Sequence, residues 1–443
     1  MLRGMSCLSG AERRGQAIPG DGGYKMVETL ALYGGKPVRA TPIAPDGERF
    51  GEEEIRLLVE VIRSQKLNCN VGSRVRQFAQ AFADYMGMKH GVMVTSGTAA
   101  IHIALGACGL EPGDEVVTSP VTDMGTVYPI LAQLGVPVFA DLDPETLCMD
   151  VSDLERRITP RTRVIVPVHL AGTPCEMDAI MALARRRNLF VVEDCAQAFN
   201  AKFKGRKVGT FGDLSCFSLN QHKHITCGDG GIALTDDDAL AERAILFADK
   251  AWPRTGEHRD HLFLAPNYRV TELQAAVALA QLTKLDHITD TRRDMGNLLT
   301  KLIADAPGIC VPRLSPGDEC TYWFYWFRVD ASLRDEFARA LTAEGLPASA
   351  GYMPKPIYLY DVLRLKKTYG NTSFPFGYAP FRDPGKEIEY CEGLCPVAER
   401  TLGQMIRFKL NEFWTEQDVR DAAECIWKVA RYFATHAHDK RLA

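Results

Sequence analysis

The sequence predicts an α/β protein in which a mainly parallel central sheet is flanked by helices, followed by a smaller C-terminal α+β domain. Between residues 91 and 195, short apolar runs alternate with helical segments, which is typical of parallel sheets. The runs are continuously apolar, as in VIVPV (164–168), and strands covered on both faces require this. The length of 443 residues also exceeds the usual size of one domain.

The N-terminal half begins with a segment of residues 1–25 that lacks a hydrophobic period, so we expect it to be flexible. Apolar residues from Ile55 to Ile62 are spaced for one face of a helix, and a second amphipathic helix is predicted from Val75 to Met86. Strand and helix segments then alternate. The expected strands are GVMVTS (91–96), DEVVTSP (114–120), VPVFADLD (136–143), RVIVPVHL (163–170) and LFVVEDC (189–195).

The C-terminal half opens with a long helical pattern, LQAAVALAQLTKLDHI (273–288). Two apolar runs, ICVPRL (309–314) and YWFYWFRVD (322–330), and two helices, 334–344 and 416–433, predict the smaller α+β domain. We therefore expect a large domain over residues 26–290 and a small domain over residues 291–443.

Composition and charge narrow the classes of function. The net charge is −4 and the charged residues are scattered, so the sequence gives no support for a nucleic-acid surface. It contains no apolar run long enough to span a bilayer and no apolar core of a signal peptide, which favours a cytoplasmic protein without membrane contact. The 13 cysteines are dispersed without any CxxC pair, so we expect neither disulfides nor a metal site. A small-molecule ligand is favoured.

Polar residues at the strand ends are the first candidates for a site, because ligands of parallel sheets bind at the carboxyl ends of the strands. Such residues follow three of the runs: Ser96-Gly97-Thr98, His169 and Glu193-Asp194. The segment TSGTAA leads from a strand into a helix through Gly97, and free N–H groups there, with a hydroxyl such as Thr98 or Ser218, suit a phosphate ester. The alternative is an ordinary helix cap.

Asp194 and Lys223 are the candidates for chemistry. A shielded carboxylate at a strand end can keep the pyridine nitrogen of a cofactor protonated, which makes the ring an electron sink, although Asp194 could instead cap a helix. Lys223 lies in FSLNQHKHITCGDGG (217–231) before a glycine turn. Taken alone, this lysine reads as a surface residue in a loop. The order of phosphate cradle, aspartate and lysine is what favours a site.

These motifs together resemble those of fold-type I enzymes that use pyridoxal 5'-phosphate (PLP), and in detail the DegT/DnrJ/EryC1/StrS family of sugar aminotransferases. The resemblance covers about residues 30 to 435. The motifs that carry it are SGTAA, PVHLAG, VVEDCAQA, FSLNQHKHITCGDGG, NYRVTELQAAVALAQL and CPVAER.

The resemblance implies roles for single residues. Lys223 would be the Schiff-base lysine, Asp194 the partner of the pyridine nitrogen, and Gln197 a contact to the ring face or its phenolic oxygen. The phosphate would be held at the start of the helix by Gly97, Thr98 and Ala99, together with Ser218. Members of the family are homodimers in which an asparagine that matches Asn267 reaches the neighbouring subunit's phosphate; the alternative for Asn267 is a turn residue.

One position departs from the family pattern. Many members carry an aromatic residue, which stacks on the cofactor, where this sequence has Asp123. Either Met124 or Tyr128 covers the ring instead, or this face is open and Asp123 meets hydroxyls of the substrate. The segment GYMPKPIYLY (351–360) and the aromatic cluster from Trp323 to Trp326 are candidates for the substrate side, although such clusters are more often core.

The predicted function is a PLP-dependent aminotransferase that moves an amino group from L-glutamate or L-glutamine to a keto-sugar or keto-cyclitol. One alternative is a sugar deoxygenase (dehydratase) that uses PLP or pyridoxamine phosphate (PMP); in its known relatives a histidine replaces the lysine, whereas Lys223 is present here. A non-catalytic PLP-binding regulator is the second alternative. The sequence does not identify the acceptor or choose between the two donors.

Overall fold

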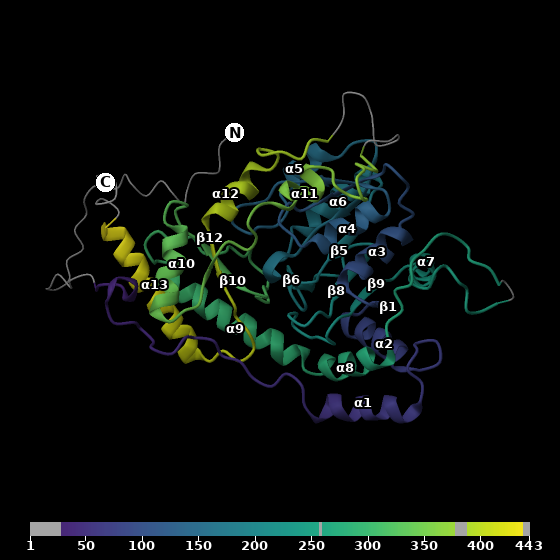
Figure 1. Cartoon of the computed structure of the whole chain (residues 1–443), viewed down its shortest axis with the longest axis horizontal. Coiled ribbons are helices and arrows are strands. Elements are labelled where there is room, and N and C mark those ends of the chain that lie inside the picture. Colours follow the sequence, from purple (N-terminus) through teal and green to yellow (C-terminus); the bar gives the residue numbers. More distant parts are fainter. Residues whose placement is uncertain (1–27, 257–258, 377–387, 437–443) are drawn as a thin grey trace.

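A seven-stranded sheet forms the centre of the larger half of the molecule (Figure 1). The computed structural model describes residues 28–256, 259–376 and 388–436, so the N-terminal segment predicted to be flexible lies outside the described residues. Across the sheet the strands are β1 (His90–Val94), β9 (Gly231–Thr235), β8 (Leu214–Ser218), β5 (Phe190–Asp194), β4 (Thr162–Val166), β2 (Glu115–Thr118) and β3 (Val136–Phe139).

The sheet is mainly parallel, as predicted. Strands β8, β5, β4, β2 and β3 pair in parallel, whereas β9 runs antiparallel to both β1 and β8. All five strands expected from the sequence are present. The strands β1, β5 and β8 point the same way, so that their carboxyl ends lie at one edge of the sheet.

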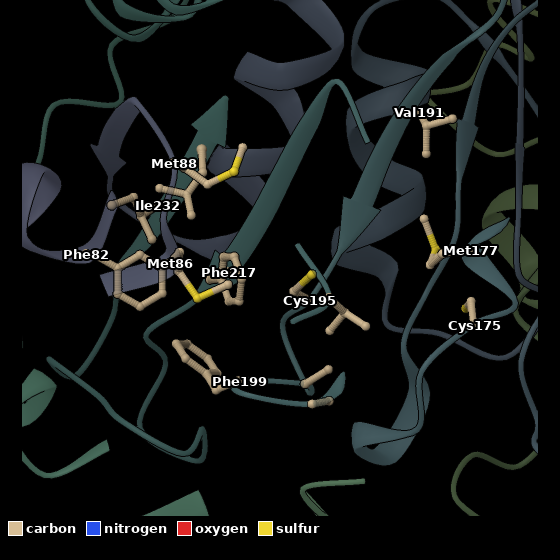
Figure 2. Close-up of a cluster of buried hydrophobic side chains, with 14 of the residues drawn as sticks. Phe82, Met86, Met88, Cys175, Met177, Val191, Cys195, Phe199, Phe217 and Ile232 are labelled. Atoms are coloured by element: carbon tan, nitrogen blue, oxygen red, sulfur yellow. The ribbon is translucent and has the colours of Figure 1, made fainter. Parts of the chain in front are cut away.

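Both faces of the sheet are covered, which explains the continuously apolar runs. Neighbouring residues point to opposite faces: Val116 packs in the cluster under α3 (Gly97–Ala107) and α7 (Asp238–Ala248), whereas Val117 packs in the cluster on the other face. Figure 2 shows part of that second cluster, in which Phe82, Phe199 and Phe217 meet side chains from the strands.

The remaining helices of this half cover the second face or connect the strands. Helix α1 (Glu52–Ser64) lies along α8 (Glu272–Leu282) at the outside of the molecule (Figure 1). The others are α2 (Arg74–Met86), α4 (Met124–Ala132), α5 (Val151–Arg157), α6 (Met177–Arg187) and the short η2 (Leu170–Gly172), with a small hairpin of β6 (Lys202–Phe203) and β7 (Arg206–Lys207).

The C-terminal half is built around a three-stranded antiparallel sheet in the order β10-β12-β11. Long helices pack around it (Figure 1). Its elements are β10 (Tyr325–Arg328), β11 (Ser349–Ala350), β12 (Met405–Phe408), α9 (Leu285–Ile303), α10 (Arg334–Glu344), α11 (Asp361–Arg364), α12 (Pro396–Gln404), α13 (Glu416–His436) and η3 (Ile357–Leu359). An early segment, η1 (Ala31–Tyr33), packs with this half through Leu30.

The long helical pattern over 273–288 is two helices, so the expectation of one continuous pattern was wrong. Helix α8 ends at Leu282 and α9 begins at Leu285. Both the hydroxyl and the N–H of Thr283 donate to the carbonyl of Ala280, three residues back, which tightens the last turn of α8. Residue 290, the expected join of the domains, lies inside α9, and the division there stays a prediction. Among the described residues no helix is long and apolar enough to cross a membrane.

Candidate active site

A cavity of about 320 Å³ lies at the carboxyl ends of β1, β5 and β8. It brings together six of the eight predicted site residues from three separate segments of the chain, 97–98, 194–197 and 218–223. The lining residues are Ser96, Gly97, Thr98, Ile101, Thr122, Asp123, Gly125, Thr126, Asp194, Ala196, Gln197, Ser218, Asn220, His222, Lys223, Asp229 and Trp323.

One end of the cavity is a tight cradle at the start of α3. The Ser96 hydroxyl caps this helix by accepting from the N–H of Ala99 at 3.0 Å, while the preceding N–H groups lack partners inside the helix. A Cβ atom on Gly97 would lie 2.7 Å from the Cβ of Ser218, so only glycine lets the helix approach the end of β8 so closely. The hydroxyls of Thr98 and Ser218 border the same space, which suits a phosphate group.

Asp194 is the last residue of β5 and is buried in the cavity wall. Its Oδ2 accepts from the Thr126 hydroxyl at 2.8 Å and its Oδ1 from the N–H of Ala196 at 3.0 Å. Burial raises the pKa of this carboxyl, and the bond from Thr126 opposes the shift. No helix follows Asp194, which excludes the alternative of a helix cap. The two bonds leave lone pairs free to accept a pyridinium N–H.

Lys223 is half-buried in the same cavity, with its Nζ 4.0 Å from the ring centroid of Trp323. Burial lowers the pKa of Lys223 to about 8, although the charges of Asp194 and Asp123 stabilise the ammonium. An ordinary lysine is almost fully protonated at neutral pH, whereas this one holds a sizeable neutral fraction. A neutral amine is a nucleophile and a base, so the site supplies a reactive lysine.

The backbone around Lys223 is clamped by Arg49. The guanidinium of Arg49 donates to the carbonyl oxygens of Gln221, Lys223 and His224 at 2.9, 2.7 and 2.5 Å. Its Nε lies 3.1 Å from Glu412 Oε1, and Arg292 pairs with the other oxygen of the same carboxylate. Arg49, which precedes the large sheet in the sequence, thus fixes the loop that carries the lysine, and Arg292 and Glu412 of the C-terminal half hold Arg49 in place.

Gln197 is held in one orientation at the side of the cavity. Its Oε1 accepts from the N–H of Ala171 at 2.9 Å, and its Nε2 donates to the hydroxyl of Tyr352 at 3.2 Å. Tyr352 belongs to the segment 351–360 that the sequence marked as a candidate for the substrate side. In the aromatic cluster of residues 323–326, Trp323 lines the cavity, whereas Trp326 is buried core.

The structure shows where Asp123 and its two neighbours lie relative to the cavity. Asp123 is exposed, lines the cavity and caps α4 by accepting from the N–H of Gly125 at 2.7 Å. Met124 packs into an apolar cluster instead, and Tyr128 lies beside His102, so neither lines the cavity. This face of the site is therefore polar.

Two predicted site residues lie outside the cavity lining. Ala99 is buried within the first turn of α3, and its N–H is used by the Ser96 cap. Asn267 is exposed, and its Oδ1 accepts from the N–H of Arg269 at 3.3 Å, as in a turn. A role for Asn267 in a neighbouring subunit stays a prediction.

His169 is fully buried behind Asp194. Its Nδ1 accepts from the N–H of Cys175 at 3.0 Å, which leaves Nε2–H to donate to Glu193 at 3.1 Å. Glu193 and Cys195 offer metal-type ligand atoms close by, but both ring nitrogens of the histidine are already engaged. His169 therefore acts as packing behind the site.

Sequence reasoning missed Thr126, Asn220, Asp229 and Arg49 as parts of the site. The signal for Thr126 was its place in VTDMGTVYP, three residues after Asp123, which brings both to the start of α4. Asn220 and Asp229 lie inside the quoted lysine motif and bond to each other at 3.0 Å. Nothing local in the sequence marks Arg49.

Together these groups can hold a phosphorylated pyridine aldehyde: a cradle for the phosphate, a buried carboxylate for the ring nitrogen and a reactive lysine for the aldehyde. An L-glutamine:2-deoxy-scyllo-inosose aminotransferase from Streptomyces kanamyceticus is 35% identical to this chain over 436 residues, which cover 92% of the chain and 98% of the relative. A GDP-perosamine synthase from Caulobacter vibrioides is 37% identical over 294 residues, 65% of this chain and 78% of the relative.

Among solved structures, NtdA from Bacillus subtilis with bound cofactor PMP matches with a TM-score of 0.74 at 25% identity, covering 86% of this chain and 82% of that one. A family model matches residues 48–379, about three quarters of the sequence. The chain therefore belongs to the DegT/DnrJ/EryC1/StrS aminotransferase family.

Proposed function

We propose that this PLP-dependent aminotransferase moves the amino group of L-glutamine or L-glutamate to the carbonyl carbon of a keto-cyclitol or keto-sugar. The observation that carries the proposal is the pair of Lys223 and Asp194 in one cavity, with a lysine pKa of about 8. Relatives named for a cyclitol and for a GDP-linked sugar support the acceptor class. The cyclitol relative aligns with almost the whole chain, so we favour a cyclitol.

PLP bound at this site supplies an electron sink for the carbanion that forms when an amino acid loses its α-proton. The residues of the chain bind and orient it. Asp194 would hold the ring nitrogen by accepting its N–H, and the bond from Thr126 fixes the carboxylate for this role. The start of α3 with Gly97, Thr98 and Ser218 binds the phosphate.

Lys223 performs two tasks in this proposal. Its Nζ would hold the cofactor in the resting enzyme, and once an amino donor has taken its place, the neutral amine would remove the α-proton of the donor. In the second half of the cycle the same Nζ returns a proton to the carbon that becomes aminated. A low lysine pKa serves both tasks because it raises the fraction of neutral amine at neutral pH.

The deoxygenase and the non-catalytic regulator are not favoured, because Lys223 is present and in place. The test is a single turnover without acceptor. L-glutamine or L-glutamate should convert the bound cofactor to its amine form, seen by absorbance, and a keto-cyclitol should convert it back. Loss of a hydroxyl from a keto-sugar with PMP, and no response to either amino acid, would replace the proposal by the deoxygenase.

We also propose a homodimer with composite sites. On α1, the apolar residues Ile55, Val59 and Ile62 are 53%, 39% and 51% exposed in the single chain, and a second copy would bury this face. Asn267 lies exposed outside the cavity of its own chain, where it can reach a neighbour. Light scattering should give a dimer at micromolar concentration, and Asn267→Ala should weaken cofactor retention. A fully active monomer would contradict both statements.

A further inference from the structure

A second cavity, of about 520 Å³, adjoins the first and shares His222 and Trp323 with it. The groups that carry charge in its wall are four cations and two carboxylates: Arg49, Arg292, Arg407 and Lys409, and Asp46 and Glu412. Arg49 and Arg292 are both committed to Glu412. The other charged groups of the wall are the cations Arg407 and Lys409 and the carboxylate Asp46, so the cavity keeps a net positive charge.

Arg407 is held so that one edge of its guanidinium stays available. It lies in β12 between Ile406 and Phe408, which point into the C-terminal core, so its own side chain points to the opposite face. Its Nε donates to the carbonyl of Gly351 at 3.2 Å, and within the described residues no carboxylate lies within ion-pair distance of it. Both Nη groups remain free to bind an oxyanion.

The aromatic side chains beside Arg407 connect it to the site. The guanidinium carbon lies 5.8 Å from the ring centroid of Phe324 and 5.9 Å from that of Tyr352. The Tyr352 hydroxyl accepts from Gln197, which lines the cavity of Lys223. Burial raises the pKa of Tyr352 to about 12, so this phenol stays neutral and does not compensate the arginine.

We infer that Arg407 binds the α-carboxylate of the amino donor, with Lys409 adding positive charge at the entrance; this rests on the proposed function. A planar guanidinium with two free Nη groups matches a carboxylate bidentately. The α-carboxylate is one bond from the carbon that loses its proton, so it must bind beside the Lys223 cavity. A keto-cyclitol carries no charge, so it cannot form an ion pair with this arginine.

The diphosphate of a nucleotide-linked sugar is the competing occupant. In such a substrate, carbons of the sugar ring separate the keto carbon from the diphosphate, so the phosphates would lie farther from the reacting carbon than an α-carboxylate. Arg407 lies beside Tyr352, whose hydroxyl accepts from Gln197 in the wall of the Lys223 cavity, and this placement next to that cavity favours the carboxylate.

The test compares Arg407→Gln and Arg407→Lys with wild type and with Arg420→Gln, an exposed arginine on α13 that does not line the cavity. With the cofactor bound, L-glutamine and 4-aminobutanamide, which is glutamine without its carboxylate, are compared in the donor half-reaction. Wild type should prefer glutamine strongly, and Arg407→Gln should reduce this preference about 10- to 100-fold, the effect of a charge-assisted pair. Arg407→Lys should recover part of it.

A binding measurement separates the inference from the proposed function. Calorimetry with 2-hydroxyglutaramate, which has the carboxylate but no amine, should give a dissociation constant at least about 10-fold weaker in Arg407→Gln than in wild type. Circular dichroism and cofactor absorbance report whether each variant is folded. If the wild type binds this acid but shows no donor turnover, the proposed function is wrong, whereas the inference about Arg407 is not affected. Unchanged glutamine preference and binding, or a loss confined to a nucleotide-linked acceptor, overturns the inference.

Discussion

The two adjoining cavities differ in how the chain builds them and in the charge they present. The cavity of Lys223 is made almost entirely from residues 96–229, at strand ends of the large sheet, and its wall carries the carboxylates Asp123, Asp194 and Asp229. The cavity of Arg407 joins residues 46–49, 221–222, 292, 323–324 and 407–413, and it is cationic. The difference indicates a division of tasks: one cavity holds the cofactor and its chemistry, and the other meets an anionic substrate.

The largest effect should come from Lys223→Ala, which removes both the attachment point and the base of the first cavity. The donor half-reaction should fall by at least about 10³-fold, within the range that a lost general base costs. Stopped-flow absorbance with L-glutamine measures it. Lys202→Ala, a lysine of the β6 hairpin paired with Glu319, is the matched control and should keep wild-type rates.

Chemical trapping checks the same residue independently. The purified enzyme should be yellow, and borohydride should fix the cofactor to the peptide that contains Lys223. A reduced adduct on Lys202 or Lys250 instead would mean that the site is assigned to the wrong lysine.

The next effect should come from Asp194→Asn, which keeps the shape of the side chain but removes its charge. The ring nitrogen then loses its ionic partner, and we expect the donor half-reaction to slow by about 10²-fold, as for other preorganised electrostatic contacts. Thr126→Val, which removes the supporting bond, should cost about 10-fold. An exposed aspartate on α7, Asp238→Asn, provides the control. Equal rates for Asp194→Asn and this control would rule out the electron-sink assignment.

A smaller effect is expected for Arg49→Gln, because Arg49 lines only the second cavity and donates to the lysine loop through backbone carbonyls alone. Its loss should lower kcat about 10-fold and speed cofactor release, while Glu412 keeps its partner Arg292. Arg56→Gln on the exposed face of α1 is the control. If Arg49→Gln lowers only the melting temperature and leaves kcat and cofactor release unchanged, the clamp is merely structural.

The contrast between the cavities also explains which parts of the fold and of the site could be predicted from the sequence. The five expected strands of the large sheet were predictable from their apolar runs. Gly97, Asp194 and Lys223 were also predictable, because each lies in a short motif at or just after the end of a strand. Arg49 and Arg407 were not, because their importance arises only when distant segments of the chain meet. The break at Thr283 was missed for a different reason: the hydrophobic period continues across it, and the bonds from the hydroxyl and the N–H of Thr283 to the Ala280 carbonyl cannot be seen in that period.

Asp123 shows a third reason why the sequence alone could not predict the whole site. Its departure from the aromatic residue of the family was visible in the sequence, but whether Met124 or Tyr128 replaced the ring depended on which way each side chain points from α4. Asp123→Phe should therefore spare the donor half-reaction and change mainly the use of the acceptor. A large loss in the donor half-reaction would indicate instead that the polar face helps to hold the cofactor.

The smallest effect we predict is a shift in the pH dependence of cofactor uptake by the apoenzyme. Only neutral Lys223 can attack an aldehyde, so the rate should rise with pH to a midpoint near 8 and level off above it. Asp123→Asn removes a charge that stabilises the ammonium, so the midpoint should move down by less than about one unit, while asparagine still caps α4. Absorbance measures uptake from pH 6 to 10, with exposed Asp294→Asn as control, since titration of the free cofactor affects all variants equally. A midpoint near 10, or an upward shift in Asp123→Asn, would show that burial and the carboxylates of Asp194 and Asp123 do not set the pKa of Lys223.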